Sequence, residues 1–369
     1  LMNKTRYFPA LPQKRIERLC KLANICARQF FKYPKQIMKC LNIRKYGLYE
    51  AVNHLFRMEP LMNEHYDVIH CQYGPIGQDL VFLKEVIDVK IFTSFRGYDL
   101  TRVVHENHPS VYEHLFKNGD KFLPVCQYFA DKLEELNCPG NRIDVLYSGI
   151  NLEKYQYQER QFDFQKKIKL LSVGRLVEKK GFKYAIAAVK ELSIKFPNIE
   201  YTIVGTGALE HELKEMVRSI KLEKNVHFIR GLIDGEMMDL YYKSQIFILP
   251  CVEAEDHDQE GIPNVLKEAM ATGLPVISTR HSGIPELIEN GVSGILVEEK
   301  NVDELIKQCE FLIFHPRQCV ELGHMGRKVI EERFDMLKLN DRLIKLYREN
   351  PSKPVEYKNK RPNEYRISC

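Results

Sequence analysis

Two glutamates, Glu260 and Glu268, enclose the start of a predicted helix in the stretch "QEGIPNVLKEAM". Pro263 suits a first helical turn, because its ring fixes φ and it lacks the N–H group that would be unpaired there. Apolar residues recur at helical spacing from Asn264 to Ala271, which predicts a helix over that range. Glu260 then lies on the loop before the helix and Glu268 within it.

This arrangement is suited to a phosphate flanked by sugar hydroxyls. The free N–H groups at a helix N-terminus stabilise negative charge, and those of Gly261 and Ile262 would point between the two carboxylates. A carboxylate can accept hydrogen bonds from vicinal hydroxyls, as on a ribose. The plain alternative is a capped helix with surface acids, but Glu268 lies near the apolar stripe, where an unpaired carboxylate would be costly.

A second group of candidates is cationic. The stretch "VGRLVEKKG" places Gly174 and Arg175 after a predicted strand and Lys180 a few residues later. Arginine binds phosphate oxygens by bidentate hydrogen bonds and lysine acts as a compact charge, so the pair is suited to a diphosphate. A solvated cluster of charges is an equally simple reading of this motif alone.

Glycines and a further arginine follow two later strands. Gly205 and Gly207 lack the third glycine of a dinucleotide fingerprint, so a tight strand-to-helix turn is favoured over donor binding. Arg230 follows another strand and could form a wall for a nucleobase, or belong to a plain turn.

The elements that must position these residues alternate between strand and helix. Strands are predicted within 66–150 and again from Ile168 onward, the last of the first series being "RIDVLYSGIN". Such alternation predicts an α/β fold with parallel sheets in two facing Rossmann-like domains, whose ligands bind beyond the carboxyl ends of the strands. The predicted organisation is an N-terminal domain at 1–149, a polar linker at 150–167, a C-terminal domain at 168–333, a crossover helix at 334–350 and a mobile tail at 351–369.

Composition narrows the class of protein. Of the 369 residues, 44% are hydrophobic and 28% charged, as in a soluble globular protein, and no apolar run is long enough to span a membrane. The ten cysteines are scattered without metal-binding spacing, which favours a reduced, cytoplasmic chain.

The net charge is +5, and basic residues are concentrated between Leu11 and Glu50 with apolar residues interleaved at helical spacing. This pattern is typical of a helix on an anionic membrane surface, or of a core-facing helix with a solvated basic side. No nucleic-acid-binding signature accompanies the charge.

The order and spacing of these motifs resemble the retaining glycosyltransferases of family 4, which have the GT-B fold. The resemblance covers roughly Ile168 to Phe334 through the glutamate pair, the Arg175–Lys180 pair and "HSGIPELIENGVSGILV". It extends more loosely to "DVIHCQYGPIG", "FTSFRGYDL" and "VLYSGINLEKY" in the first half. The chain looks most like the bacterial group that builds exopolysaccharide or colanic-acid-type repeat units, and exopolysaccharide or lipopolysaccharide biosynthesis is the process this implies.

The resemblance implies transfer of a hexose from a UDP- or GDP-sugar to a growing, lipid-linked glycan with retention of configuration. Glu268 would bind the ribose, Glu260 the donor sugar hydroxyls, and Arg175 and Lys180 the diphosphate. Backbone of Gly261, Ile262, Pro263 and Asn264 would lie against sugar and phosphate. No cofactor or metal is expected, since two cations and a helix terminus supply the positive charge. The expected location is the cytoplasm, with a peripheral position on the inner face of the cytoplasmic membrane as an extension.

The chain departs from the family in two places. Many members carry histidine where this chain has Arg96 in "RGYD", with Asp99 retained; arginine is no base at neutral pH, so it would hold an anion or form a structural ion pair. The family's opening strand and glycine-rich loop are also missing before Tyr66, which leads us to expect an N-terminally truncated first domain. The rival functions are a non-catalytic nucleotide-sugar-binding or scaffolding subunit, a nucleotide-sugar epimerase, or a phosphorylase, whose pyridoxal-phosphate lysine motif the sequence lacks.

Overall fold

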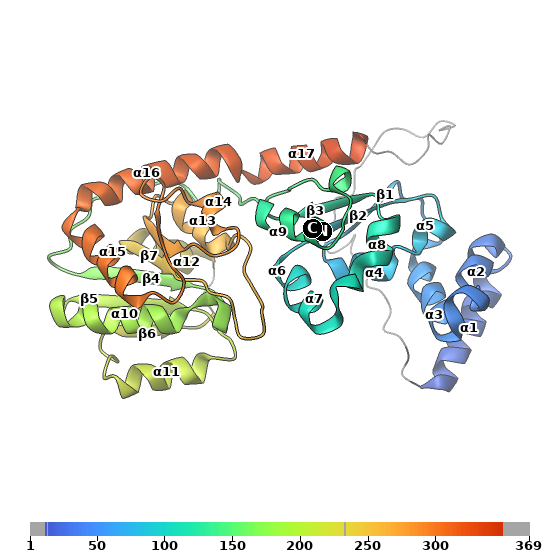
Figure 1. Cartoon of the computed structure of the whole chain (residues 1–369), viewed down its shortest axis with the longest axis horizontal. Coiled ribbons are helices and arrows are strands. Elements are labelled where there is room, and N and C mark those ends of the chain that lie inside the picture. Colours follow the sequence, from blue (N-terminus) through green and yellow to red (C-terminus); the bar gives the residue numbers. More distant parts are fainter. Residues whose placement is uncertain (1–11, 13, 232–233, 350–369) are drawn as a thin grey trace. The chain divides into compact units, whose positions relative to one another are not determined.

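The computed structural model describes residues 12, 14–231 and 234–349 (Figure 1). These residues form two compact units, each built from segments distant in sequence. Unit 1 contains the described residues up to Thr93, with Tyr112–Lys121 and the end of the last helix from Leu346; unit 2 contains Ser94–Val111 and Phe122–Lys345.

Unit 1 begins with three helices, α1 (Arg15–Gln29), α2 (Pro34–Cys40) and α3 (Ile43–Met58). One side of this helical layer is apolar, since Ile25, Ile37 and Leu55 are buried in a core shared with Leu83 and Ile91. The prediction of little strand structure before Tyr66 agrees with this all-helical start.

Three short parallel strands form the first sheet in the order β1–β2–β3: Val68–Cys71, Lys90–Phe95 and Lys121–Pro124. Strand β1 pairs with β2 in the register Val68 to Lys90. The helices around these strands are α4 (Gly74–Leu80), α5 (Leu83–Val86), α6 (Gly97–Leu100), α7 (Arg102–Asn107), α8 (Glu113–Asn118) and α9 (Gln127–Glu135), with 3-10 turns at Glu59–Leu61 (η2), Pro109–Tyr112 (η3) and Gly140–Arg142 (η4).

One predicted strand is wrong. The stretch "RIDVLYSGIN" forms no strand; it makes only isolated bridges, from Ile143 to Phe122 and from Ile150 to Asp335. Asp144 and Leu146 donate backbone hydrogen bonds to the Phe122 and Pro124 carbonyls of β3, at 3.0 and 2.9 Å, but this pairing is too short to count as a strand.

The second sheet has six parallel strands in the order β6–β5–β4–β7–β8–β9. Their bounds are Ile168–Val173 (β4), Ile199–Val204 (β5), Val226–Ile229 (β6), Ile246–Leu249 (β7), Val276–Thr279 (β8) and Ile295–Val297 (β9). Strand order reverses between β4 and β7, which pair at Leu170 and Ile246. Such a switch point opens a crevice beyond the carboxyl ends of the two strands.

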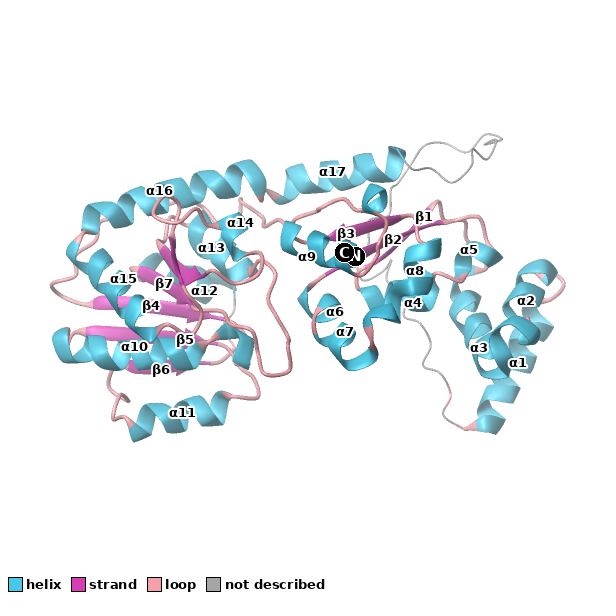
Figure 2. Cartoon of the chain, viewed as in Figure 1, coloured by secondary structure: helices cyan, strands magenta, loops and turns pink. Residues whose placement is uncertain are grey.

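Helices cover the second sheet, as Figure 2 shows around β4, β5, β6 and β7. Right-handed crossovers send the helices after β4 and after β7 to opposite faces, because the chain moves outward from the switch point in opposite directions. The helices are α10 (Phe182–Lys195), α11 (Glu210–Ser219), α12 (Asp234–Lys243), α13 (Asn264–Ala271), α14 (Ile284–Leu287), α15 (Val302–Phe314), α16 (Pro316–Arg333) and α17 (Met336–Glu349), with a 3-10 turn at Glu178–Lys180 (η5).

The segment predicted as a linker, 150–167, has no helix or strand but is firmly packed. Tyr155 and Phe164 are buried in the core of the second sheet. The Arg160 guanidinium donates hydrogen bonds to the backbone carbonyls of Tyr241 and Ser244, at 2.9 Å each, and of further residues there. Despite its polar sequence, this segment is therefore an ordered strap that is fixed to the rest of unit 2 by buried aromatic residues and by Arg160.

The predicted α/β class with parallel sheets is confirmed. Helix α17 occupies the range predicted for a crossover helix, and its residue Tyr347 bonds His70 within unit 1, with 2.6 Å between the hydroxyl and Nδ1. The predicted mobile tail at 351–369 lies outside the described residues.

Candidate active site

The loops that follow the two central strands meet at the switch point of the second sheet. The first runs from Gly174 through η5, and the second runs from Pro250 to Pro263, ahead of helix α13. A backbone hydrogen bond of 3.0 Å from Val252 N–H to Lys179 C=O joins them. Gly181 makes this junction possible: its φ is +69° and a Cβ there would lie 1.8 Å from the Pro250 carbonyl oxygen. Only glycine fits such a position.

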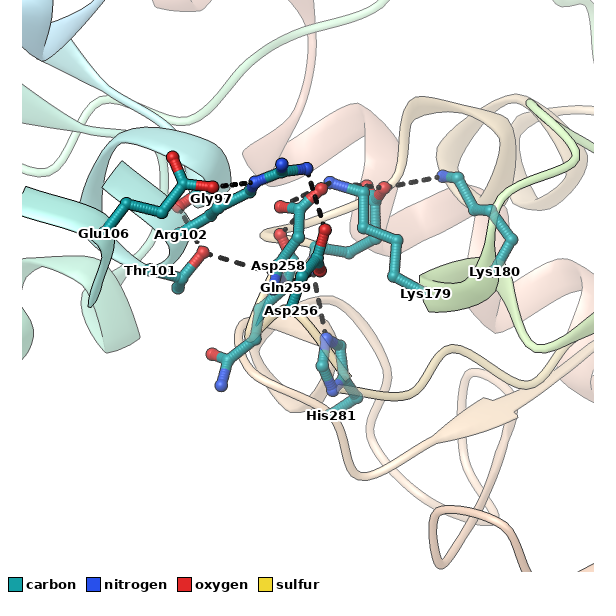
Figure 3. A network of polar contacts seen from close by, with 11 residues as sticks. Gly97, Thr101, Arg102, Glu106, Lys179, Lys180, Asp256, Asp258, Gln259 and His281 are labelled. Atoms are coloured by element: carbon teal, nitrogen blue, oxygen red, sulfur yellow. Dashed lines mark hydrogen bonds and ion pairs between the residues drawn. The ribbon is translucent and has the colours of Figure 1, made fainter. Parts of the chain in front are cut away.

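Two lysines from the first loop hold Glu260 from the second. Lys180 Nζ lies 3.2 Å and Lys179 Nζ 3.3 Å from Glu260 Oε1, and Lys179 also bonds Asp258 at 2.9 Å. The lysine side chains are 7–9% exposed and that of Glu260 14%. The cluster contains two ammonium groups and two carboxylates, so its charges balance (Figure 3). Balanced pairing is the condition under which charges tolerate burial.

The charge state of Glu260 follows from this pairing. Burial alone would raise the pKa of the carboxyl, but the nearby Lys180 and Lys179 ammonium groups outweigh it and hold the pKa below its usual value. Glu260 is therefore a carboxylate at neutral pH. It can accept hydrogen bonds, and it already forms ion pairs with Lys179 and Lys180.

Glu268 lies in a simpler environment on α13, which spans Asn264–Ala271 as predicted. Its carboxylate is half-buried and accepts a hydrogen bond of 2.8 Å from the Tyr241 hydroxyl. Burial, and then the Glu268 charge, raise the pKa of Tyr241 well above its usual value, so this hydroxyl stays protonated. Pro263 is the N-cap of the helix, with ψ at 128°, one position earlier than the first helical turn expected for it.

Arg175 lies on the first loop with an exposed side chain. The structure gives its guanidinium no ion pair among the described residues, in contrast to Lys180. Gly174 precedes it at the end of β4, where a Cβ would lie 3.5 Å from Lys180 Cε in ordinary contact.

Gly205 and Gly207 occupy close contacts between two loops. A Cβ at Gly205 would lie 1.9 Å from the Gly174 carbonyl oxygen, and one at Gly207 2.4 Å from that of Leu176. Hydrogen bonds of 2.9 Å from Leu176 N–H to Thr206 C=O and from Leu209 N–H to Leu176 C=O complete the junction. The tight turn therefore accounts for both glycines, and it supports the loop that carries Arg175.

Arg230 anchors the same region. Its Nε lies 2.5 Å from Glu210 Oε1, and Lys214 binds the same carboxylate at 2.7 Å. These hydrogen bonds, that of Arg230 first, lower the pKa of Glu210 to about 2. The Arg230 side chain is nonetheless largely exposed, so one face of the guanidinium is open to solvent.

Asp99 and Arg96 lie where β2 meets the short helix α6. Asp99 is fully buried, and its carboxylate accepts the Arg96 backbone N–H at 3.2 Å, as in a capping box. Through that contact Asp99 has a structural role, because it caps the start of α6. Arg96 is half-buried, and its charge adds a little to the lowering of the pKa of Lys267 in α13, which burial mainly causes.

The loop before Glu260 packs on α6 and α7 within unit 2. A Cβ at Gly97 would lie 2.0 Å from the Gln259 carbonyl oxygen, and one at Gly261 3.0 Å from the Phe129 ring. Arg102 binds Asp256 at 2.8 Å (Figure 3). Gly261, Ile262 and Pro263 thus follow Glu260 through a tightly packed bend that leads into α13, with Asn264 exposed at its first turn.

Sequence reasoning missed several residues of this site. Lys179 was overlooked beside Lys180, although the doubled lysine in "EKKG" was a signal. His281 and Glu299 hold the Glu260 loop from below, and only the "HSGIPE" segment hinted at the first. Glu286 of that segment accepts the N–H groups of Gln127 and Tyr128 at 2.8 and 3.0 Å, at the start of α9. No local pattern indicates such partners.

A cavity of about 640 Å³ adjoins the loop before Glu260, lined by residues that include Thr101, His105, Lys132, Glu253, His257 and Gln259. Within the described ranges, no three His, Cys, Asp or Glu side chains gather as metal ligands would. Among the described helices, none is both long and apolar enough to cross a bilayer.

Comparison with known proteins agrees with this geometry. Residues 154–329 match the model of the family "Glycosyl transferases group 1". The chain is 36% identical to the amylovoran biosynthesis glycosyltransferase AmsK of Erwinia amylovora, covering 83% of this chain and 76% of AmsK. It is 31% identical to WcaL of Salmonella typhimurium, a protein assigned to colanic acid biosynthesis as a glycosyltransferase, over 94% of this chain and 86% of WcaL.

The fold has solved counterparts. HepE of Anabaena, crystallised with UDP, superposes with a TM-score of 0.67 at 17% identity, covering 77% of this chain and 79% of HepE. This likeness confirms the predicted GT-B fold. The chain belongs to the group 1 glycosyl transferases, together with the amylovoran and colanic acid glycosyltransferases that it resembles.

Proposed function

We propose that this glycosyltransferase moves a hexose from a UDP- or GDP-sugar to a growing, lipid-linked glycan in exopolysaccharide biosynthesis, with retention of configuration. The observation that carries this proposal is the meeting of Lys180 and Glu260 at the switch point, where an anion-binding group and a hydroxyl-binding group come within 3.2 Å. Family membership supplies the reaction class, and the UDP bound to HepE makes a nucleotide donor the natural candidate.

In this proposal the donor binds to the loops just described. Arg175, exposed and unengaged, and Lys180 bind the diphosphate, while Glu268 accepts the ribose hydroxyls. Glu260 accepts hydroxyls of the hexose, and the backbone from Gly261 to Asn264 lies along the sugar and phosphate. Arg230 lies beside the base.

Charge development determines the mechanism. As the bond between sugar C1 and the phosphate oxygen breaks, negative charge grows on the diphosphate, and fixed cations stabilise it. The acceptor hydroxyl oxygen bonds to C1 on the face that the diphosphate leaves, and its proton passes to a phosphate oxygen. The reaction needs no carboxylate nucleophile, and we propose that it needs no metal, because Arg175 and Lys180 supply the positive charge.

Calorimetry with UDP and GDP tests the donor site, with Glu268→Ala as the control. Binding of one nucleotide that the alanine variant loses supports the site and identifies the base. Turnover in excess EDTA then tests metal independence, and loss of turnover there contradicts it. A chain that binds the nucleotide but transfers no sugar to any glycan supports the non-catalytic binding subunit instead, for which Arg96 in the family's histidine position is the motivating observation.

We further propose that the enzyme works in the cytoplasm at an anionic membrane surface, through helices α1–α3. One side of these helices meets the core, but exposed apolar side chains lie on them and on the turn between α1 and α2, Ile16 of α1 at 75% and Phe31 of the turn at 94% exposure among them. Exposed basic residues lie on the same helices and on the residues that flank them: Lys14, Arg15, Arg28, Lys32, Lys35, Lys39, Arg44 and Lys45. Apolar groups with surrounding cations suit a bilayer rich in anionic lipid.

Co-sedimentation with phosphatidylglycerol-containing vesicles and with phosphatidylcholine vesicles tests this surface. We expect binding only to the anionic vesicles, reduced by salt and by the combined change Lys35→Glu and Lys39→Glu. Equal binding to both vesicles, or none to either, contradicts the proposal.

A further inference from the structure

His281 lies beneath the Glu260 loop and contacts it through the backbone. The residue follows β8 and is 2% exposed. Its Nε2 is 3.1 Å from the Glu260 backbone nitrogen, and its Nδ1 is 2.6 Å from Glu299 Oε1, beyond the end of β9 (Figure 3 shows the first contact). His281 therefore connects a carboxylate on one loop with the backbone of another.

These contacts determine the protonation of the ring. A backbone N–H can only donate, so Nε2 must accept and carries no proton. The proton of the neutral imidazole then lies on Nδ1 and is donated to Glu299. A histidine whose second nitrogen is held by a carboxylate has a defined tautomer and ring orientation.

Glu299 holds the loop at two points. Its Oε1 binds His281, and its Oε2 accepts the Glu253 backbone N–H at 2.9 Å. Burial would raise the pKa of Glu299, but the hydrogen bond from His281 and then that from Glu253 N–H lower it overall. The carboxylate is thus ionised and grips the start of the loop directly and its end through His281.

The loop between these two points is irregular and acidic. Its Asp256 binds Arg102 and its Asp258 binds Lys179, and the φ of +62° at His257 is unusual for a residue other than glycine. Glu260 ends this stretch. To bind a ligand productively, its carboxylate must stay within about 0.5 Å of its correct position.

We propose that the Glu299–His281 pair is a positioning device for Glu260, and that it sets the affinity for the sugar part of the donor. His281 and Glu299 are assigned as positioning residues, because His281 is buried and the polar atoms of both side chains contact the backbone of the loop and each other. This inference rests on the proposed function for the identity of the ligand. Of the residues proposed to bind the donor, the pair contacts only Glu260 among the described residues, so we expect it to contribute mainly to binding of the hexose and to turnover rather than to binding of the nucleotide.

Side-chain length supplies a matched set of variants. Glutamine places an amide oxygen near the position of Nε2 and can still accept the Glu260 N–H. Asparagine places its amide near Nδ1, so it can reach Glu299 but not Glu260. We expect His281→Gln to retain function and His281→Asn and His281→Ala to lose it. Glu299→Gln is paired with the control Glu298→Gln, an exposed neighbour whose carboxylate meets only Arg280 among the described residues.

The experiment compares affinity for UDP and UDP-glucose, or GDP and GDP-mannose, with kcat and KM for the donor that binds. In His281→Ala, His281→Asn and Glu299→Gln, we expect the extra affinity of the sugar nucleotide to disappear and kcat to fall by about 10–100-fold, the scale of a misplaced catalytic group. Affinity for the bare nucleotide should stay within about twofold. His281→Gln and Glu298→Gln should behave like the unaltered chain.

Hydrogen–deuterium exchange of the peptide containing Glu260 separates this inference from the proposed function. Faster exchange in His281→Ala and His281→Asn, but not in His281→Gln, supports positioning whatever the ligand. If the unaltered chain binds no nucleotide, the proposed function fails and the exchange rates still decide the role of His281. Unchanged exchange, or equal loss of bare nucleotide affinity in the alanine variant, overturns the inference.

Discussion

The two glutamates of one short stretch are held in opposite ways. Glu260 lies on an irregular loop, between two ammonium groups, with its backbone fixed by His281. Glu268 lies on a regular helix and meets one neutral hydroxyl, that of Tyr241. The loop residue therefore depends on distant partners for its charge and its position, whereas the helix itself places Glu268. Removal of the Glu260 side chain should therefore destabilise the fold, whereas removal of the Glu268 side chain should not.

The largest expected effect tests that dependence directly. Glu260→Ala leaves two buried ammonium groups with Asp258 as their one carboxylate partner among the described residues, so we expect a loss of about 3–5 kcal/mol in the free energy of unfolding. If Glu260 accepts hydroxyls of the donor sugar, as proposed, turnover should fall by at least about 10³-fold. Chemical denaturation and initial rates measure the two losses. Unchanged stability would mean that the lysines find other partners and the contrast with Glu268 fails.

A third ionisable group of the stretch sharpens the comparison. Lys267 is fully buried; its ammonium contacts the Ser148 carbonyl and faces the Phe334 ring at 5.6 Å. Burial lowers its pKa from 10.5 to about 7 and outweighs the nearby Glu268 charge, which acts in the opposite direction.

Because the unfolded chain binds this proton more tightly, the free energy of unfolding should fall as pH drops from about 10.5 to about 7. We expect Lys267→Met to remove this slope and to stabilise the protein at pH 7.5 by about 2–4 kcal/mol, at roughly 1.4 kcal/mol per unit of pKa. Thermal unfolding between pH 7 and 10 measures it. An identical pH slope in both proteins contradicts the assignment, and Lys338→Met on the exposed start of α17 is the control.

A smaller effect is expected at the helix glutamate. Glu268→Gln keeps the shape and the contact with Tyr241 but weakens the hydrogen bonds proposed to the ribose hydroxyls of the donor, so nucleotide affinity should fall by about tenfold. The free energy of unfolding should change by less than about 1 kcal/mol, in contrast to Glu260→Ala. Calorimetry and denaturation together test the pair of values. A large loss of stability here would make the two glutamates alike.

The smallest effect concerns the hydroxyl that holds Glu268. Tyr241→Phe removes a hydrogen bond worth about 1 kcal/mol and leaves the Glu268 carboxylate half-exposed to water. Nucleotide affinity should change by less than about fivefold. An effect as large as that of Glu268→Gln would show that Tyr241, and not the helix, places the carboxylate.

Local pattern predicted the parts of the fold that local forces determine. The bounds of α13 and the parallel strands of the second sheet follow from apolar periodicity, and the motif spacing placed Glu260, Glu268, Lys180 and Arg175 on loops and a helix of one sheet edge. Contacts between segments that are distant along the chain produce no pattern in the local sequence. Lys179, His281 and Glu299 come together only because three loops end at the same edge.

The same limit explains the two departures in the fold. The stretch 143–150 has the residue types of a strand but no continuous neighbour, and pairing rather than propensity makes a strand. Conversely, the segment 150–167 was predicted to be a polar linker. The sequence does not show that Arg160 donates hydrogen bonds to backbone carbonyls of residues far along the chain.

That arginine has a practical consequence for recombining these enzymes. A chimera that exchanges donor-binding halves between relatives would commonly be joined within the polar stretch, where the sequence looks permissive. Arg160 makes a junction after it hazardous, because the residue and its carbonyl partners at Tyr241, Tyr242, Ser244 and Thr272 would then come from different parents. Joining the parents at 148–150 keeps the strap and its acceptors from one source.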